Sequence, residues 1–248
     1  LPDLRYRKYR KLKKSGLLLS EKYSLVGISR QEGIGYSRLS ADLELSKSWQ
    51  TENGLIVRGT GNILTAAYSE NNINTERYLL KVYPLGALEF KYPFFRARNN
   101  KSEVLIPVAQ VVYSTDASSP EHPIDEDSST TEFDSTTLFK LKKIPGIDRQ
   151  ENGLRLNAGL QYFYEYKHDY KYNVNLGQVY RNKNSEDFLP SSGLNGYESD
   201  ILLSGNLSFR KDLEIASTQV YSKNFTLKRS NTSLKLTKPR YQIKTGLT

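Results

Sequence analysis

Residues 35–50 read GYSRLSADLELSKSWQ, and apolar and polar side chains alternate through most of this stretch. The apolar set is Leu39, Ala41, Leu43, Leu45 and Trp49, and the polar set is Ser40, Asp42, Glu44, Ser46 and Ser48. Successive side chains of a β-strand point to opposite faces of the sheet, so the two sets lie on opposite faces. This stretch therefore predicts a long strand with one apolar and one polar face.

The same alternation returns at residues 154–167, 170–176 and 201–210. Strands of globular proteins average about 5–6 residues, whereas a tilted strand that crosses a membrane needs about 9–11. Several of the predicted strands are of the longer kind. Tyrosines also gather on both sides of the turn predicted at His168-Asp169, as in the aromatic girdle of a membrane barrel: Tyr162, Tyr164, Tyr166, Tyr170 and Tyr172.

The composition of the 248 residues agrees with this interpretation without deciding it. No apolar run approaches the ~20 residues of a spanning helix, which excludes a helical membrane protein. The 18 Tyr and 9 Phe are too many for a disordered chain. A soluble β-sandwich with tyrosine-rich edges has the same composition and stays open as an alternative.

The net charge is +9, and seven of the cations lie between Arg5 and Lys14. A basic cluster of this kind suits an anionic membrane surface or nucleic acid, but charge runs are more often solvated. We interpret it as a solvated strand and turn, and we expect no nucleic-acid partner.

We predict an all-β fold, specifically an antiparallel, up-and-down transmembrane β-barrel wall of about ten or eleven strands. Turns rich in Asn, Gly, Asp and Lys separate the strands. The predicted strands are 3–10, 16–29, 35–50, 54–68, 77–95, 102–114, 154–167, 170–176, 201–209, 212–228 and 232–247.

One connection, residues 115–153, is too long for a turn and lacks a clean strand. It holds an acidic cluster (Asp125 to Asp134) followed by a basic one (Lys140 to Lys143). Loops of more than about 15 residues are usually functional or disordered, and the long loops of outer-membrane barrels face outward. We therefore predict that 115–153, and the shorter connection 182–198, lie outside the cell.

Catalytic chemistry has little support in the sequence. There is no Cys, and the two histidines, His122 and His168, lie in unrelated contexts, so a transition-metal site is not expected. The acidic cluster offers carboxylate oxygens suited to Ca²⁺, but without the spacing of a helix-loop-helix calcium site. We predict a protein that is not an enzyme and has no cofactor.

Several motifs, in order along the chain, resemble those of the LptD family of lipopolysaccharide-assembly outer-membrane proteins. They are LPDLRYR (1–7), YPLGALEFKYPF (83–94), EVLIPVAQ (103–110), IDEDS (124–128), EFD (132–134), TLF (137–139), GIDR (146–149), ENGLR (151–155) and NLGQVY (175–180). The sequence departs from the family pattern at Asp125, where Asn is usual, and at Thr136-Thr137, where Thr-Asn is usual.

The resemblance implies lipopolysaccharide transport to the outer leaflet of a Gram-negative outer membrane. It implies a larger barrel than these strands can form, a periplasmic domain that joins a lipopolysaccharide-transport bridge, an LptE-like plug lipoprotein, and a lateral gate and cysteines outside this stretch. The motif residues of the long loop are Asp125, Glu126, Asp127, Glu132, Phe133, Asp134, Asp148 and Arg149.

We further expect lumen-facing charges to contact the plug or the saccharide phosphates: Asp42, Glu44, Arg155, Glu165, Lys167 and Lys171. Generic lumen polarity is the alternative interpretation of each, because such lumens are polar in general. A passive porin-type channel is the alternative function. Because a section of a barrel has open edges, we also expect that residues 1–248 do not fold stably alone.

Overall fold

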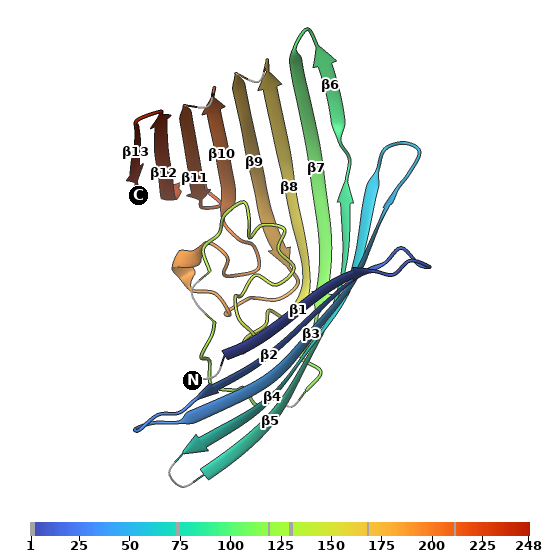
Figure 1. Ribbon diagram of the computed structural model, residues 1–248, viewed down its shortest axis with the longest axis vertical. Helices are drawn as coiled ribbons and strands as arrows, with labels where there is room; N and C mark the ends of the chain where they lie inside the picture. Colours follow the sequence, from blue (N-terminus) through green and yellow to red (C-terminus); the bar gives the residue numbers. More distant parts are fainter. Residues whose placement is uncertain (1–2, 73–74, 119, 129–130, 168, 211) are drawn as a thin grey trace.

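The computed structural model describes residues 3–72, 75–118, 120–128, 131–167, 169–210 and 212–248. Within them it contains thirteen β-strands and no α-helix, and the only helical element is a short 3-10 turn, η1 (Pro190–Ser192). The strands, shown in Figure 1, are β1 (Asp3–Lys11), β2 (Leu18–Ile28), β3 (Gly35–Gln50), β4 (Ile56–Asn72), β5 (Thr75–Lys91), β6 (Phe94–Arg98), β7 (Lys101–Ser114), β8 (Gly153–Tyr166), β9 (Tyr170–Arg181), β10 (Ile201–Phe209), β11 (Leu213–Tyr221), β12 (Leu227–Lys238) and β13 (Tyr241–Leu247).

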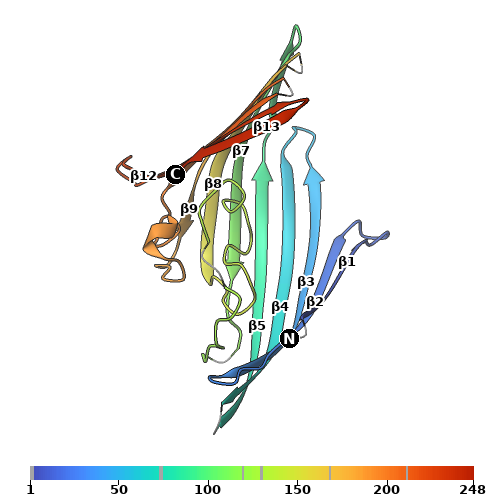
Figure 2. The ribbon, with the colours of Figure 1, turned by 60° about the vertical axis from the view of Figure 1, so that its left-hand side comes forward.

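All thirteen strands belong to one antiparallel sheet, in which neighbours follow the order of the chain. The short β6 lies off this path and pairs only with β7. β1 and β13 are the two edges and do not pair with each other, so the sheet stays open. Figures 1 and 2 show that it is strongly curved. The predicted all-β, up-and-down architecture of a partial barrel is confirmed.

The number and bounds of the strands need correction. The strand predicted at 77–95 is interrupted at Tyr92-Pro93, where proline has no N–H to give to the ladder. The strand predicted at 212–228 contains a turn, because Phe225 has φ 58° and Ser222 and Thr226 close the chain with a hydrogen bond of 2.8 Å. Another turn, at Pro239-Arg240, splits the region predicted as 232–247. The described residues therefore contain thirteen strands instead of ten or eleven.

Some details of the sequence interpretation lie outside the described residues, namely the motif residues Leu1 and Pro2, and the turn residues His168 and Lys211.

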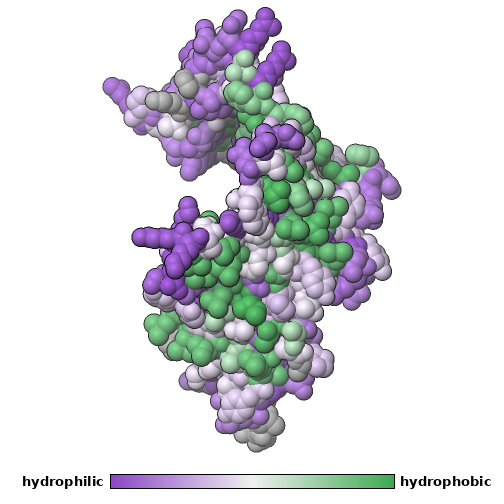
Figure 3. All heavy atoms as spheres, turned by 90° about the vertical axis from the view of Figure 1, so that its right-hand side faces the viewer, coloured by the Kyte–Doolittle hydropathy of each residue, from purple (hydrophilic) through white to green (hydrophobic). Residues whose placement is uncertain are grey.

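The distribution of polar and apolar side chains over the two faces of the sheet is the reverse of that in a soluble protein, because polar side chains are buried and apolar ones are exposed. Arg38 and Ser40 of β3 are buried, whereas Leu39 between them is 60% exposed. In β4, Asn62 is buried and the following Ile63 is exposed. The space-filling view in Figure 3 shows apolar side chains gathered in a broad band, with hydrophilic side chains toward the ends. The convex face is therefore largely apolar and the concave face polar.

Aromatic side chains cluster near the β8–β9 turn, as the sequence indicated. The rings of Tyr164 and Tyr172 stack with centroids 4.8 Å apart, and Tyr166 lies 6.2 Å from Tyr170. Tyr170 in turn contacts Phe209 of β10 at 4.7 Å. These rings form two aromatic groups at the short-turn end of the sheet, one around Tyr172 and one around Tyr170.

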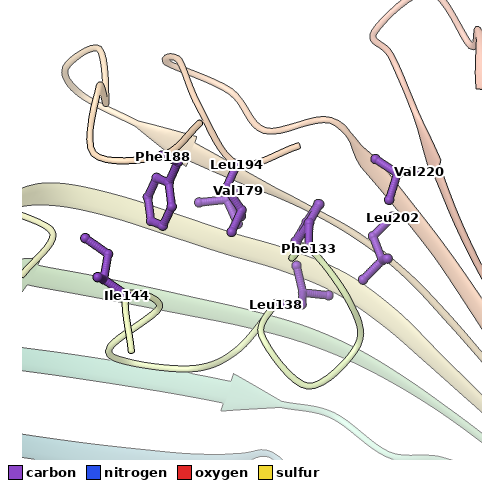
Figure 4. Packing of buried hydrophobic residues seen from close by; sticks show 8 residues of the cluster. All are labelled: Phe133, Leu138, Ile144, Val179, Phe188, Leu194, Leu202 and Val220. Carbon is purple, nitrogen blue, oxygen red and sulfur yellow. The ribbon is translucent and has the colours of Figure 1, made fainter. Parts of the chain in front are cut away.

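The long connections lie at one end of the strands, namely 115–152 between β7 and β8, and 182–200 between β9 and β10. Both fold back against the concave side of the sheet (Figures 1 and 2). A buried apolar cluster joins them to the sheet, as Figure 4 shows: Phe133, Leu138 and Ile144 from the first loop, Phe188 and Leu194 from the second, and Val179, Leu202 and Val220 from the strands. Among the described residues, no helix has the length and apolar character needed to cross a membrane.

Candidate functional site: the loop on the concave face

The connection 115–152, here called the β7–β8 loop, is attached to the concave face by three groups of polar contacts. The first is centred on Arg38 of β3, whose side chain is almost fully buried. Its Nη1 lies 2.6 Å from Oδ1 of Asp148 and 2.5 Å from Oδ2 of Asp127. The hydroxyl of Tyr36 donates to the same Asp148 oxygen at 2.6 Å. Two loop carboxylates are thus held by one guanidinium and one phenol from the wall.

Backbone donors complete this first contact. Asp127 accepts the N–H groups of Ile147 and Asp148 at 3.0 and 3.1 Å, and Asp148 accepts that of Glu126 at 2.9 Å. Gly146 has φ +87°, and a Cβ there would meet the carbonyl oxygen of Asp127 at 2.6 Å. Only glycine fits this close approach without a shift. The IDEDS and GIDR motifs are therefore two halves of one folded unit.

The carboxylates of Asp125, Asp127 and Asp148 lie within 4.8 Å of one another, which is close enough for a metal ion. Arg38 already supplies a positive charge to two of them. The pKa of Asp148 is raised, chiefly by burial and further by the Asp127 charge, and the hydrogen bond from Tyr36 and the charge of Arg38 oppose only part of this rise. We therefore interpret this cluster as an ion-paired anchor of the loop instead of a calcium site.

The second contact is a buried charge cluster where the loop enters β8. Glu151 Oε1 lies 2.6 Å from Nε of Arg181, and Oε2 lies 3.6 Å from Nη1 of Arg155. All three side chains are at most 3% exposed. Burial alone would raise the pKa of Glu151, but Arg155 and Arg181 outweigh it, and the pKa is lowered. Arg155, in β8, also donates a hydrogen bond to the carbonyl of Leu141, in the loop, and thereby joins the strand to the loop.

Lys143 reinforces this cluster from within the loop. Its Nζ donates to the carbonyls of Leu138, Thr137 and Lys140 at 2.7, 3.0 and 3.2 Å. Three acceptors match the three donors of an ammonium group. Complete burial lowers the pKa of Lys143 well below its usual value, and the Glu151 charge opposes that effect. The loop backbone is folded around this side chain.

The third contact lies on the inner wall of β3. Lys142 Nζ is 2.9 Å from Oδ1 of Asp42, and the Asn62 amide donates to the same oxygen at 2.6 Å. Burial lowers the pKa of Lys142, and Asp42 opposes this. A cavity of about 580 Å³ lies between the loop and the wall at this contact. Glu44, on the same face of β3 as Asp42, lines this cavity together with Asp42 and Lys142.

Two glycines make room for the loop between these contacts. Gly159 of β8 is directly opposite Gly177 of β9. A Cβ at Gly159 would lie 2.9 Å from Cζ of Phe139, and one at Gly177 would collide with the side chain of Leu138. The TLF motif therefore packs on a flat site made by two glycines of the concave face.

The structure divides the sequence-predicted lumen residues among separate places. Asp42 and Glu44 lie at the third contact, and Arg155 at the second. Glu165 and Lys171 are directly opposite each other near the short turns and form an ion pair of 3.0 Å. Lys167 lies in the β8–β9 turn, with its Nζ 5.5 Å from the centre of the Tyr166 ring. The six residues therefore do not form one site.

The predicted motif residues of the loop also differ in their contacts and in their burial. Glu126 forms a paired contact with Arg30 at 2.7 and 2.8 Å, and Asp134 accepts the N–H groups of Thr136 and Thr137 at 2.8 Å. Phe133 is fully buried, whereas Glu132 is exposed and lies 3.9 Å from Arg229. Asp125 accepts the N–H of Ser128, and Arg149 lies 3.7 Å from Asp187.

Sequence reasoning missed the contacts that attach the loop. Their wall residues are Tyr36, Arg38 and Arg181, and their loop residues are Lys142, Lys143 and Glu151. A partial signal existed for two of them. Arg38 is a cation on the polar side of the clearest alternating strand, and Glu151 belongs to the quoted ENGLR motif. Lys143 gave no such signal, because burial of a lysine depends on the path of the loop around it.

An open, curved antiparallel sheet with an apolar convex face and a polar concave face defines a section of a β-barrel wall. The β7–β8 loop is folded on the polar side of this wall. The family model described as LPS transport system D (LptD) matches residues 1–246, and the chain belongs to this LptD family of lipopolysaccharide-transport proteins. A comparison with curated proteins finds no match.

Proposed function

We propose that this chain forms part of the wall of the outer-membrane barrel through which lipopolysaccharide is delivered to the outer leaflet. The observation that carries the proposal is the inverted sheet, apolar outside and polar inside, with the family's motif loop attached to the inner face. The apolar face suits contact with lipid acyl chains. The polar face suits a hydrated saccharide.

The long connections support an orientation. In outer-membrane barrels long loops face the outside and short turns face the periplasm. The β7–β8 loop and connection 182–200 are both at one end of the strands, whereas the turns at 51–55, 99–100 and 239–240 are at the other. We therefore place the β7–β8 loop at the extracellular end, folded inward over the concave face.

The partners follow from family membership and from the same geometry. An LptE-like plug lipoprotein would contact the concave face, and a periplasmic lipopolysaccharide-transport bridge would deliver substrate at the short-turn end. Outer-membrane lipids would cover the convex face. The LptD family consists of transport and assembly proteins, and we propose no enzymatic step for this chain.

The competing function is a passive porin-type channel. The loop packs on the concave face through the apolar cluster of Figure 4, which narrows the space that a porin would leave open. The test uses the full-length protein in detergent and in planar bilayers. A translocon barrel is expected to co-purify with a lipoprotein and to conduct poorly, and depleting it is expected to reduce lipopolysaccharide at the cell surface. Steady conductance without a partner, with surface lipopolysaccharide unchanged on depletion, would support the porin.

A further inference from the structure

Cations crowd one carboxylate on the concave wall formed by β1, β2 and β3. Arg7 of β1 is directly opposite Lys22 of β2, and Lys22 is directly opposite Asp42 of β3. Like charges directly opposite each other on neighbouring strands destabilise a sheet. Lys142 of the loop also approaches Asp42, so two cations share this carboxylate and Arg7 is the next cation along the row.

The existing ion pairs leave this row with excess positive charge. Asp42 binds Lys142 at 2.9 Å and Lys22 at 3.5 Å, and it also accepts a hydrogen bond from Asn62. Within the residues that the structure describes, no carboxylate forms an ion pair with Arg7, which lies exposed at one end of the row. An unbalanced arrangement of this kind favours an anion from outside the chain.

Two adjoining cavities provide the space for such an anion. One, of about 580 Å³, lies between the wall and loop residues 139–146, and the other, of about 340 Å³, lies nearer the β1 edge. Arg7, Lys22, Asp42 and Gly146 line both, so the two spaces adjoin. Cations outnumber carboxylates in the lining of each, and the larger cavity adds Arg58 and Lys140.

We propose that these two adjoining spaces, together named the Arg7–Lys22 cavity, bind the phosphate groups of a saccharide moving along the concave face. Guanidinium groups bind phosphate through two parallel hydrogen bonds, and ammonium groups add point charges. Thr60 at the larger cavity, together with Glu44, offers hydrogen bonds to sugar hydroxyls. The anionic class of the ligand rests on these side chains, whereas its identification as lipopolysaccharide rests on the proposed function.

The test compares two pairs of charges in the full-length protein. Arg7→Gln with Lys22→Gln removes the proposed site. Arg98→Gln with Lys101→Gln is the matched control, because these two cations are also directly opposite each other on neighbouring strands, β6 and β7, and lie outside both cavities. Each protein is titrated with a deacylated, phosphorylated core oligosaccharide, with the same oligosaccharide after dephosphorylation, and with inorganic phosphate.

We expect the R7Q/K22Q variant to bind the phosphorylated oligosaccharide about tenfold more weakly. The R98Q/K101Q control should bind like the unaltered protein, and Arg7→Lys should keep most of the affinity. Binding should weaken as salt concentration rises. If R7Q/K22Q fails to fold, Lys140→Gln, at an exposed loop position in the same cavity, is expected to show a smaller loss in the same direction.

Three results would overturn the proposal. The first is equal binding by R7Q/K22Q and its control. The second is equally tight binding of the dephosphorylated oligosaccharide, which would mean that phosphate is not recognised. The third is equally tight binding of inorganic phosphate, which would assign the cavity to the free ion. Each outcome is separate from the proposed function, which fails only if depletion of the protein leaves surface lipopolysaccharide unchanged.

Discussion

The side chain of Leu138 lies directly over Gly177, so that a Cβ at position 177 would collide with it. Leu138 belongs to the β7–β8 loop and Gly177 to β9, and both motifs that contain them were among those shared with the LptD family. The contact explains why a leucine-phenylalanine pair and a strand glycine occur together. It also places the loop on the wall at a defined position.

We expect Gly177→Ala to destabilise the attachment of the loop by about 1–3 kcal/mol, the usual range for overpacking. The matched control is Gly61→Ala, because Gly61 is also in a strand, opposite another glycine, and has open space at its Cβ. Thermal unfolding of the full-length protein and limited proteolysis within 115–152 would measure the effect. Leu138→Ala should offset part of the loss in the double variant, and an additive double variant would argue against the contact.

Replacing Arg38 should release the loop more strongly. Arg38→Met leaves Asp127 and Asp148 without their buried counter-charge, and removing one partner of a buried pair typically costs about 3–5 kcal/mol. Arg30→Met is the control, because the Arg30–Glu126 pair tethers the same loop but is solvent-exposed at Arg30, and exposed pairs contribute little to stability. Faster cleavage of the loop in R38M than in R30M is expected, and equal rates would contradict this assignment.

The buried Glu151 predicts a loss of stability in acid. Its pKa is lowered in the folded protein, so its stabilising contribution is present at neutral pH and is lost as pH falls through that lowered value. Glu151→Gln should therefore lower the unfolding temperature at pH 7, because Arg155 and Arg181 lose their counter-charge. The difference from the unaltered protein should shrink as the pH is lowered from about 5 toward 3. A difference that stays constant over this range would show that the charge of Glu151 is not responsible.

Residues 1–248 expressed alone are not expected to form a stable barrel. β1 and β13 have unpaired edges in the open sheet, and lipid offers no hydrogen bonds to exposed strand backbone. The polypeptide should aggregate or stay heterogeneous in detergent. A monodisperse species that shifts in electrophoretic mobility on heating would show that the sheet closes on itself.

The sequence by itself determined which face of each strand is polar, because side chains alternate with a period of two whatever the strand's neighbours are. Leu39 and Ser40 were assigned to opposite faces on that ground, and the structure confirms it, with Leu39 exposed and Ser40 buried. The motifs also identified the family, since their order along the chain is a one-dimensional property. The alternation did not determine the strand ends, because Tyr221, Phe225 and Leu227 keep the same parity on both sides of the turn at Ser222–Thr226.

Only the tertiary structure decided what the β7–β8 loop contacts. Arg38 and Asp148 are 110 residues apart in the sequence, and nothing local links them. Their pairing depends on the curvature of the sheet and on the loop's path around Lys143. The same holds for Arg7 and Lys142, which share one cavity only because the loop folds back over β1–β3. Local chemistry fixed the faces, whereas long-range packing fixed the contacts.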